Sequence, residues 1–330
     1  KIDLIAANTD LQVLHISKAP KKIQLGLKLT KGLGAGMKPE VGRDSAVESY
    51  EEIKATLKGA DIIFIAAGLG GGTGTGAAAI IAKAAKEIGA LTVSVVTKPF
   101  SWEGKKRAGL ANLGLEELKK VSDSIIIVPN DRLLEIIDES VGMKDAFKII
   151  DNILYQAVNG MSEVILNPGN SDINTDFADV KTIMQHKGMA LMGIGRAKGE
   201  NAAQRALEDA IDSPLLDKVS LNGAKGILIH FNIHPQVSLF AINDVMGTIN
   251  DRMDSNAEII FGTTSDSTLE KDEVKITIVA TGFESKNDEI EEPSEGVEEN
   301  NNQNAVALDS ETYLDVPPLM RDYVVQYQLN

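Results

Sequence analysis

The chain has 330 residues, of which 43% are apolar and only 4% are aromatic, and its formal net charge is −15. This length supports one large or two medium domains with mainly aliphatic cores, and no basic footprint for nucleic acid is present. The absence of cysteine excludes disulfides, thiolate catalysis and thiolate metal sites, and four histidines without ligand spacing predict no protein-held metal.

The first part of the chain, residues 1–162, alternates short apolar runs with helical patterns. The apolar runs are Ile62–Ala67, Leu91–Val96 and Ser124–Val128. Strands at this spacing predict a parallel sheet with helices on both faces, which is an α/β fold. Ligands in such sheets bind at the carboxyl ends of the strands.

A Gly-rich run follows the first of these strands and precedes an Ala-rich helical segment, residues 77–85. The run consists of Gly70, Gly71, Gly72, Thr73, Gly74, Thr75 and Gly76. Glycines let backbone N–H groups approach an anion, and the positive end of the following helix points to the same place. The pattern predicts a phosphate cradle, whereas the alternative interpretation is a tight turn that merely tolerates glycine.

The cradle differs from a P-loop, because Ala77 and Ala78 stand where a P-loop has Lys and Ser or Thr. Binding through backbone amides and threonine hydroxyls is therefore expected. Thr97–Pro99 and Pro129–Asp131 directly follow the next two strands, so both segments should meet the cradle at one edge of the sheet.

A long helix is predicted from Lys144 to Glu163, because apolar residues recur there at helical spacing. At about 1.5 Å per residue, its roughly 20 residues reach about 30 Å. The helix could therefore connect the nucleotide end of the fold to the loop Asn167–Asp179.

A second, smaller α/β domain is expected over residues 163–283. Its elements are Met184–Gly193, a helix Ala202–Asp212, and strands Gly226–Phe231, Ala257–Gly262 and Val274–Thr281. Residues 284–330 hold twelve acidic and two basic side chains, a net charge of −10. This composition predicts a disordered acidic tail, with a linker over 284–311 and a partner-binding peptide over 312–330.

The GGGTGTG run resembles the signature of the tubulin/FtsZ GTPases, and the flanking segments are more similar to bacterial FtsZ than to tubulin. The resemblance covers about 280 of the 330 residues in one order. It rests on Asn8–Asp10, Lys31–Gly36, Thr97–Phe100, Glu103–Arg107, Pro129–Asp131, Asn174–Asp179 and Val279–Gly282.

The resemblance implies a GTP/GDP site whose phosphates lie on the Gly-rich run, with Thr75 at the β-phosphate. Further implied contacts are Gly34, Ala35 and Gly36 at the γ-phosphate, Glu103 at the ribose, Arg107 at a phosphate, Phe147 and Asp151 at guanine, and the turn residues Thr97, Pro99 and Asn130. The alternative for Glu103 and Arg107 is a helical ion pair, and Phe147 could serve only in the core.

Catalysis is implied for Asn174, Asp176 and Asp179, which match the family's catalytic loop. Without the family match, two acidic residues at a helix start would indicate capping. The loop lies opposite the nucleotide in the family, so the site would be completed by the next molecule, with Mg²⁺ neutralising phosphate charge. Such a head-to-tail contact does not close and propagates as a filament.

The family also implies partners and a location. The chain would associate with itself, and Leu314–Arg321 would bind membrane-tethering and regulatory division proteins. No stretch of 18 apolar residues occurs and no signal peptide is predicted. We therefore expect a cytoplasmic protein at the mid-cell division site, with only indirect membrane contact.

Two departures from the family pattern are visible. The chain opens at what matches the family's second strand, so the first strand with its Gly-rich turn is expected to be missing, exposing a strand edge and removing phosphate and base donors. Relative to the family pattern, two residues are also added in Asn167–Ile173, before the catalytic loop, where longer loops cost little.

Two other functions are compatible with parts of the sequence. One is a nucleotide-independent interaction protein that recruits partners through its tail. The other is a nicotinamide-dependent oxidoreductase, which needs an acidic ribose ligand about 20 residues after the turn. Glu87 is too close to the turn for that role.

Overall fold

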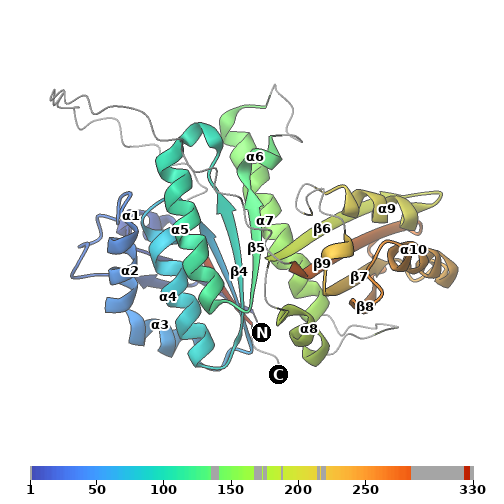
Figure 1. Ribbon diagram of the computed structural model, residues 1–330, viewed down its shortest axis with the longest axis horizontal. Coiled ribbons are helices and arrows are strands. Elements are labelled where there is room, and N and C mark those ends of the chain that lie inside the picture. Colours follow the sequence, from blue (N-terminus) through green and yellow to red (C-terminus); the bar gives the residue numbers. More distant parts are fainter. Residues whose placement is uncertain are drawn as a thin grey trace, which may run out of the picture.

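The computed structural model describes residues 2–134, 141–166, 173, 177–186, 189–213, 216, 221–283 and 323–327 (Figure 1). Its strands are β1 (Ile2–Asn8), β2 (Lys21–Gln24), β3 (Ile62–Gly68), β4 (Leu91–Lys98), β5 (Ser124–Pro129), β6 (Met189–Lys198), β7 (Gly226–Ile233), β8 (Glu258–Ser265), β9 (Glu273–Phe283) and β10 (Tyr323–Tyr327). Its α-helices are α1 (Leu11–Ile16), α2 (Pro39–Glu48), α3 (Tyr50–Leu57), α4 (Thr73–Glu87), α5 (Lys105–Val121), α6 (Asn130–Leu133), α7 (Met143–Leu166), α8 (Phe177–Met184), α9 (Ala202–Ile211) and α10 (Leu239–Asp251).

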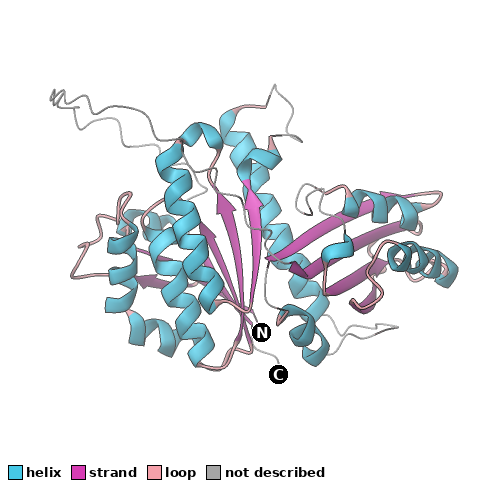
Figure 2. Cartoon of the chain, in the orientation of Figure 1, coloured by secondary structure: helices cyan, strands magenta, loops and turns pink. Residues whose placement is uncertain are grey.

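The described strands form one sheet in the order β2-β1-β10-β3-β4-β5-β6-β9-β7-β8. Strands β3, β4, β5 and β6 run parallel, β9 is antiparallel to both of its neighbours, and β7 and β8 run parallel. The predicted α/β fold with a parallel sheet and two units is therefore confirmed. Figure 2 shows helices lying against the strands of both units.

Strand β10 is a feature that the sequence did not predict. It lies between β1 and β3 and is antiparallel to both, with Val325 paired to Leu4 on one side and to Phe64 on the other. Residues 323–327 were expected to belong to a partner-binding peptide outside the fold. The expected open strand edge is wrong, because β10 pairs with β1. The partner-binding role of the C-terminal segment stays a prediction.

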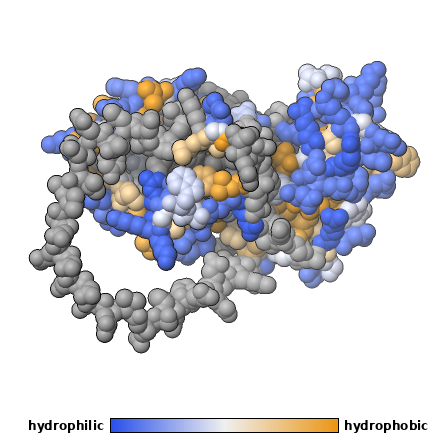
Figure 3. Space-filling view, turned by 90° about the horizontal axis from the view of Figure 1, so that it is seen from above, coloured by the Kyte–Doolittle hydropathy of each residue, from blue (hydrophilic) through white to orange (hydrophobic). Residues whose placement is uncertain are grey.

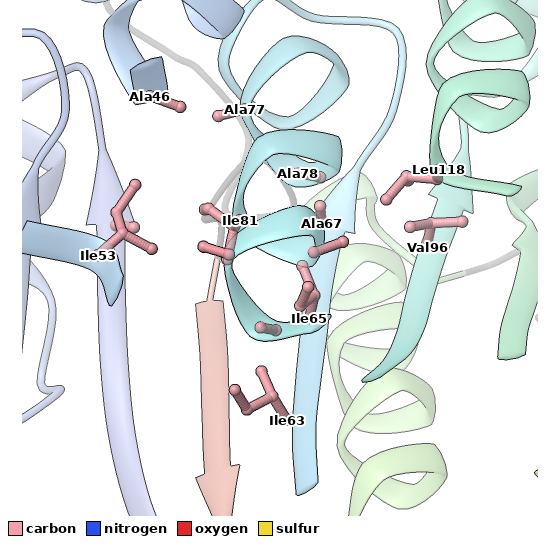
Figure 4. Packing of buried hydrophobic residues seen from close by; sticks show 14 of the residues in the cluster. Ala46, Ile53, Ile63, Ile65, Ala67, Ala77, Ala78, Ile81, Val96 and Leu118 are labelled. Atoms are coloured by element: carbon pink, nitrogen blue, oxygen red, sulfur yellow. The ribbon is translucent and has the colours of Figure 1, made fainter. Parts of the chain in front are cut away.

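One face of the parallel strands is covered by α4 and α5. Side chains of α4 and of β3 form the centre of this core, and Figure 4 shows Ala77, Ala78 and Ile81 of α4 between Ile53 of α3 and the side chains of β3. The scarcity of aromatic residues agrees with this aliphatic packing. Small alanines let the helix lie close to the sheet.

The opposite face packs on the long helix α7. Val158 and Met161 of α7 lie in one cluster with residues of β4, β5, β6, β7 and β9. The helix spans 24 residues, or about 36 Å at 1.5 Å per residue. The predicted central helix is confirmed, and it packs across the junction between the two units.

The second unit buries another face of its strands against α9 and α10. Its strands continue the sheet of the first unit, because β6 pairs with β5. Within the described ranges that pairing comprises two positions, Ile125 with Met189 and Ile126 with Ala190, whereas β6 and β9 pair along most of their length. The two units thus share one sheet through a short seam.

Among the described residues, no helix is both long and apolar enough to cross a membrane. The predicted linker over 284–311 and the peptide Leu314–Arg321 lie outside the described residues, as do Asn174 and Asp176.

Candidate functional site

The Gly-rich run lies where the sequence placed it, between strand β3 and helix α4. Strand β3 ends at Gly68, and α4 begins at Thr73. Gly70 has φ +107°, a conformation that favours glycine. The backbone N–H of Gly70 donates a 2.9 Å hydrogen bond to the buried hydroxyl of Thr75. The run is therefore a preorganised turn at the N-terminus of a 15-residue helix, where anions are favoured.

The glycines of the run have different structural roles. A Cβ on Gly76 would lie 1.9 Å from the carbonyl oxygen of Pro39, and one on Gly72 would lie 2.3 Å from the carbonyl oxygen of Gly36. These two glycines allow close backbone packing. A Cβ on Gly71 would meet nothing within 4 Å. Gly71 therefore faces open space, as a residue of a ligand cradle should.

A second Gly-rich turn, Gly34–Gly36, packs against the first. The contact between Gly72 and the Ala35–Gly36 backbone brings the two turns together. Gly36 has φ +58° and open space where its Cβ would be. The geometry joins the two segments that were predicted to bind phosphates.

The sequence did not single out Thr9 as a site residue, although Thr9 lies in a segment that carries the resemblance. The hydroxyl oxygens of Thr9 and Thr73 are 2.6 Å apart, which connects the end of β1 to the start of α4. The neighbouring Asp10 caps α1 by accepting from the N–H groups of Gln12 and Val13. Thr9 thus holds the first turn of the anion-facing helix.

The turn after β4 also reaches the Gly-rich run. The N–H of Leu69 donates to the carbonyl of Thr97 at 3.0 Å. A Cβ on Gly70 would lie 3.2 Å from Pro99 and 3.1 Å from the carbonyl oxygen of Arg107. Thr97, Pro99 and the backbone of Arg107 therefore lie beside the cradle.

Glu103 and Arg107 form the ion pair that was the alternative interpretation of their spacing. The Nη1 of Arg107 donates to Oε2 of Glu103 at 2.6 Å, and Oε1 of Glu103 accepts from the N–H of Phe100 at 2.8 Å. Both side chains remain partly exposed. Their predicted contacts with ribose and phosphate stay predictions.

Asn130 opens α6, directly after β5, and its side chain is only 4% exposed. Its Oδ1 has no hydrogen-bond partner among the described residues. Next to it, Oδ1 of Asp131 accepts from the N–H of Ser101 at 2.9 Å, which ties this turn to the turn after β4. A buried oxygen without a donor is costly, so Asn130 is suited to accept from a bound ligand.

The exposed Trp102, the only tryptophan, stacks on buried Phe100 with ring centroids 5.3 Å apart. Phe147 and Asp151 lie one turn apart in α7, which Figure 1 shows starting near α6 and running alongside β5 towards α8. The side chain of Phe147 lies outside what the structure describes, and the predicted roles of Phe147 and Asp151 at guanine stay predictions.

Of the predicted catalytic residues, only Asp179 is described. It is exposed in the first turn of α8, as expected for an acidic residue near a helix start. In Figure 1, α8 lies at the end of α7 that is far from α6. The structure therefore does not bring Asp179 together with the Gly-rich run of the same chain.

The residues at the cradle fit a nucleotide better than a protein-held metal. No group of three or more His, Asp or Glu residues that could hold a metal occurs within the described ranges. The cradle instead offers backbone N–H groups, open glycines and the orphaned Asn130 oxygen. Figure 3 looks onto the side of the molecule to which the β4 arrow points, where the visible described surface is largely hydrophilic.

Comparison with known proteins agrees with this geometry. Residues 1–138 match the family model described as the tubulin/FtsZ family GTPase domain, and residues 188–284 match that of the FtsZ family C-terminal domain.

Two similar solved structures are from M. jannaschii: an empty FtsZ dimer and an FtsZ point mutant. Each is 47% identical to this chain with TM-score 0.78; the alignments cover 84% of this chain and 80% and 82% of theirs. CetZ1 from Haloferax volcanii, a GDP-bound monomer, is 20% identical over 85% of both chains with TM-score 0.72, which shows the fold alone.

Proposed function

Because this chain belongs to the tubulin/FtsZ family of GTPases, we propose that it binds and hydrolyses GTP as the subunit of a head-to-tail filament. One observation carries the proposal: the turns after β3, β4 and β5 converge on one edge beside the N-terminus of α4. This edge supplies backbone donors for phosphates. It also supplies a carboxylate, a guanidinium and a buried amide oxygen from Glu103, Arg107 and Asn130.

The roles of the individual residues follow from their chemistry. Open glycines at positions 36 and 71 let backbone N–H groups reach phosphate oxygens. Arg107 is held by Glu103 and can turn its remaining donors towards a phosphate. Mg²⁺ held mainly by the nucleotide would neutralise phosphate charge, since no described acidic cluster could hold it.

Hydrolysis requires a group that orients water at the terminal phosphate, and no acidic side chain is available within the Gly-rich run itself. Asp179 is exposed on α8 and separate from the cradle of its own chain. We infer that Asp179, with Asn174 and Asp176, acts on the nucleotide of the adjacent subunit. One relative is described as a dimer, which supports self-association.

A complementation experiment tests the shared site. Asp179→Ala removes the acidic group but leaves the cradle, whereas Gly71→Asp places a carboxylate in the open cradle and leaves α8 intact. Each variant alone should lose roughly 10²–10⁴-fold in GTP turnover. An equimolar mixture should recover about one quarter of the wild-type rate, because one joint in four combines an intact cradle with an intact Asp179.

Lys181→Ala, on the same helix, is the matched control and should retain the wild-type rate. If the mixture stays inactive while both variants remain folded and co-assemble, the shared site is refuted. Full turnover by a dilute monomer that does not associate would refute it equally.

We further propose that the filament serves cell division, forming a ring at mid-cell in the cytoplasm and contacting the membrane through proteins that bind Leu314–Arg321. Family membership supports division, while the bacterial setting, the location and the tether stay predictions. Because residues 323–327 form β10, the test removes residues 313–321 only, which should abolish co-sedimentation with a tether and leave polymerisation intact. The nucleotide-independent alternative is not favoured by membership of a GTPase family.

A further inference from the structure

Helix α8 carries Asp179, the one predicted catalytic residue that the structure describes, so the packing of α8 decides where that carboxylate lies. Val180, Ile183 and Met184 of α8 are buried in the core cluster that also contains Leu228 of β7. In Figure 1, α8 lies at the lower end of α7, next to β7 and β8. The helix is therefore seated on the sheet of the second unit, with Asp179 on its exposed side.

The start of the segment that carries Asp179 is attached to β8. Ile173 and Thr263 of β8 form an isolated antiparallel bridge. The N–H of Ile173 donates to Oγ1 of Thr263 at 3.2 Å, and the N–H of Thr263 donates to the carbonyl oxygen of Ile173 at 3.0 Å. Thr263 is only 2% exposed. Because Ile173 directly precedes Asn174, the bridge fixes the point at which the predicted catalytic loop begins.

The end of the same segment is attached to β9 and, again, to β8. Thr281 of β9 is buried, and its Oγ1 donates to the carbonyl oxygen of Ile183 at 2.8 Å. The last C=O groups of a helix have no partner within the helix, so the Thr281 hydroxyl satisfies one of them from the sheet. Two residues after α8, Nε2 of His186 lies 3.2 Å from Oε2 of Glu258, the first residue of β8.

We propose that Thr263 and Thr281 are positioning residues for the proposed hydrolysis. They attach the two ends of the Asp179 segment to the sheet of the second unit and thereby set the place of its carboxylate at the joint between subunits. The proposal rests on the proposed function and names further residues of the same shared site. Both threonines belong to the second unit, whereas the cradle follows β3 in the first unit. Their loss should therefore lower the rate of hydrolysis and leave the affinity for GTP unchanged.

Substitution by valine tests each attachment. Thr263→Val keeps the shape of the side chain but removes the acceptor of the Ile173 N–H. Since a misplacement of about 1 Å can cost about 100-fold in rate, GTP turnover by the assembled protein should fall by about 10–100-fold. The dissociation constant for GTP should keep its wild-type value. Thr263→Ser keeps the hydroxyl and should recover most of the rate, and Thr281→Val and Thr281→Ser should behave in the same way. Wild-type turnover in both valine variants would overturn the proposal.

Thr264→Val is the matched control. Thr264 is the neighbour of Thr263 on β8 and is also buried, but its Oγ1 lies 3.0 Å from Nε2 of His230. The same substitution therefore removes a buried hydrogen bond from the same strand without touching the Asp179 segment. It should leave turnover unchanged. An equal loss of turnover in Thr264→Val would mean that general weakening of β8 causes the defect, and this also overturns the proposal.

Mixtures of variants show on which side of the joint the defect lies. Mixed with Gly71→Asp, whose α8 is intact, Thr263→Val should reach about one quarter of the wild-type rate, as expected for Asp179→Ala. Mixed with Asp179→Ala, it should stay at its residual rate, because both variants lack a well-placed carboxylate. Recovery in this second mixture would assign the defect to the cradle side and would contradict the positioning role.

Failure of the proposed function has a different signature. In that case the reference mixture of Asp179→Ala with Gly71→Asp stays inactive, and the shared site and the positioning role fall together. If the reference mixture recovers while Thr263→Val and Thr281→Val turn over GTP at the wild-type rate, the shared site stands and only the positioning role is refuted.

Discussion

The backbone N–H of Gly70, in the turn between β3 and α4, donates to the side-chain hydroxyl of Thr75 in the first turn of α4, and both residues are buried. The hydrogen bond closes the turn internally. The resemblance implies that Thr75 lies at the β-phosphate, but its hydroxyl already accepts the hydrogen bond from the Gly70 N–H. We therefore expect Thr75 to act mainly by holding the backbone donors in place.

The first prediction concerns this hydrogen bond. Thr75→Val keeps the shape of the side chain but leaves the Gly70 N–H without an acceptor, so the free energy of unfolding should fall by about 1–3 kcal/mol. GTP affinity, measured by calorimetry, should fall with it. Thr75→Ser keeps the hydroxyl and should retain affinity. A loss in Thr75→Ser without a loss in Thr75→Val would point to the methyl group instead.

A second prediction separates packing glycines from open ones. In Gly76→Ala, the new Cβ would lie 1.9 Å from the Pro39 carbonyl, so α2 and α4 must move apart. Overpacking of this kind should cost about 3 kcal/mol in chemical denaturation. Gly71→Ala is the control, since nothing lies within 4 Å of its Cβ position. Similar stabilities of the two variants would contradict the described packing.

A third prediction concerns Asn130, whose buried Oδ1 lacks a partner among the described residues. Asn130→Ala removes an unsatisfied polar group, so the nucleotide-free protein should lose little or no stability. GTP affinity should nevertheless fall, by up to about tenfold, because one ligand hydrogen bond contributes at most about 1.4 kcal/mol. A stability loss without any change in affinity would assign Asn130 to the fold alone.

The fourth prediction is a pH dependence. Arg196 donates to the buried carboxylate of Glu273, and this bond, together with the N–H of Glu270, lowers the pKa of Glu273 below its ordinary value of 4.5. A carboxylate whose pKa is lower in the folded state stabilises the protein at pH values above its unfolded-state pKa. This stabilisation is lost as the pH falls through the folded-state pKa. Urea unfolding midpoints should therefore decrease below pH 4.5. Glu273→Gln should show a weaker decrease than the parent chain over the same range.

Much of the fold was accessible from the sequence because apolar runs and helical spacing are local signals. The predicted runs Ile62–Ala67, Leu91–Val96 and Ser124–Val128 lie within β3, β4 and β5, and the helix predicted from Lys144 lies within α7. In contrast, β10 was missed. Its pairing depends on contacts with strands about 260 and 320 residues earlier in the chain, and no local pattern reports such pairing.

The candidate site could be predicted in part from the sequence for the same reason. The three turns could be placed on one edge because each directly follows a parallel strand. The sequence could not distinguish Gly71, which faces open space, from Gly72 and Gly76, which let backbones touch. The two kinds of glycine look alike in the sequence. They differ only in whether the backbone of residue 36 or 39 lies against the position that a Cβ would take.

In the part of the chain that the structure describes, two paired positions between β5 and β6 join the two units, and α7 packs across that junction. So short a ladder resists bending far less than the long ladder between β6 and β9. We therefore expect bending between the two units to occur at this junction, beside Ile125 and Ile126. In the proposed filament, curvature would accumulate within subunits at this junction as well as at the joints between them.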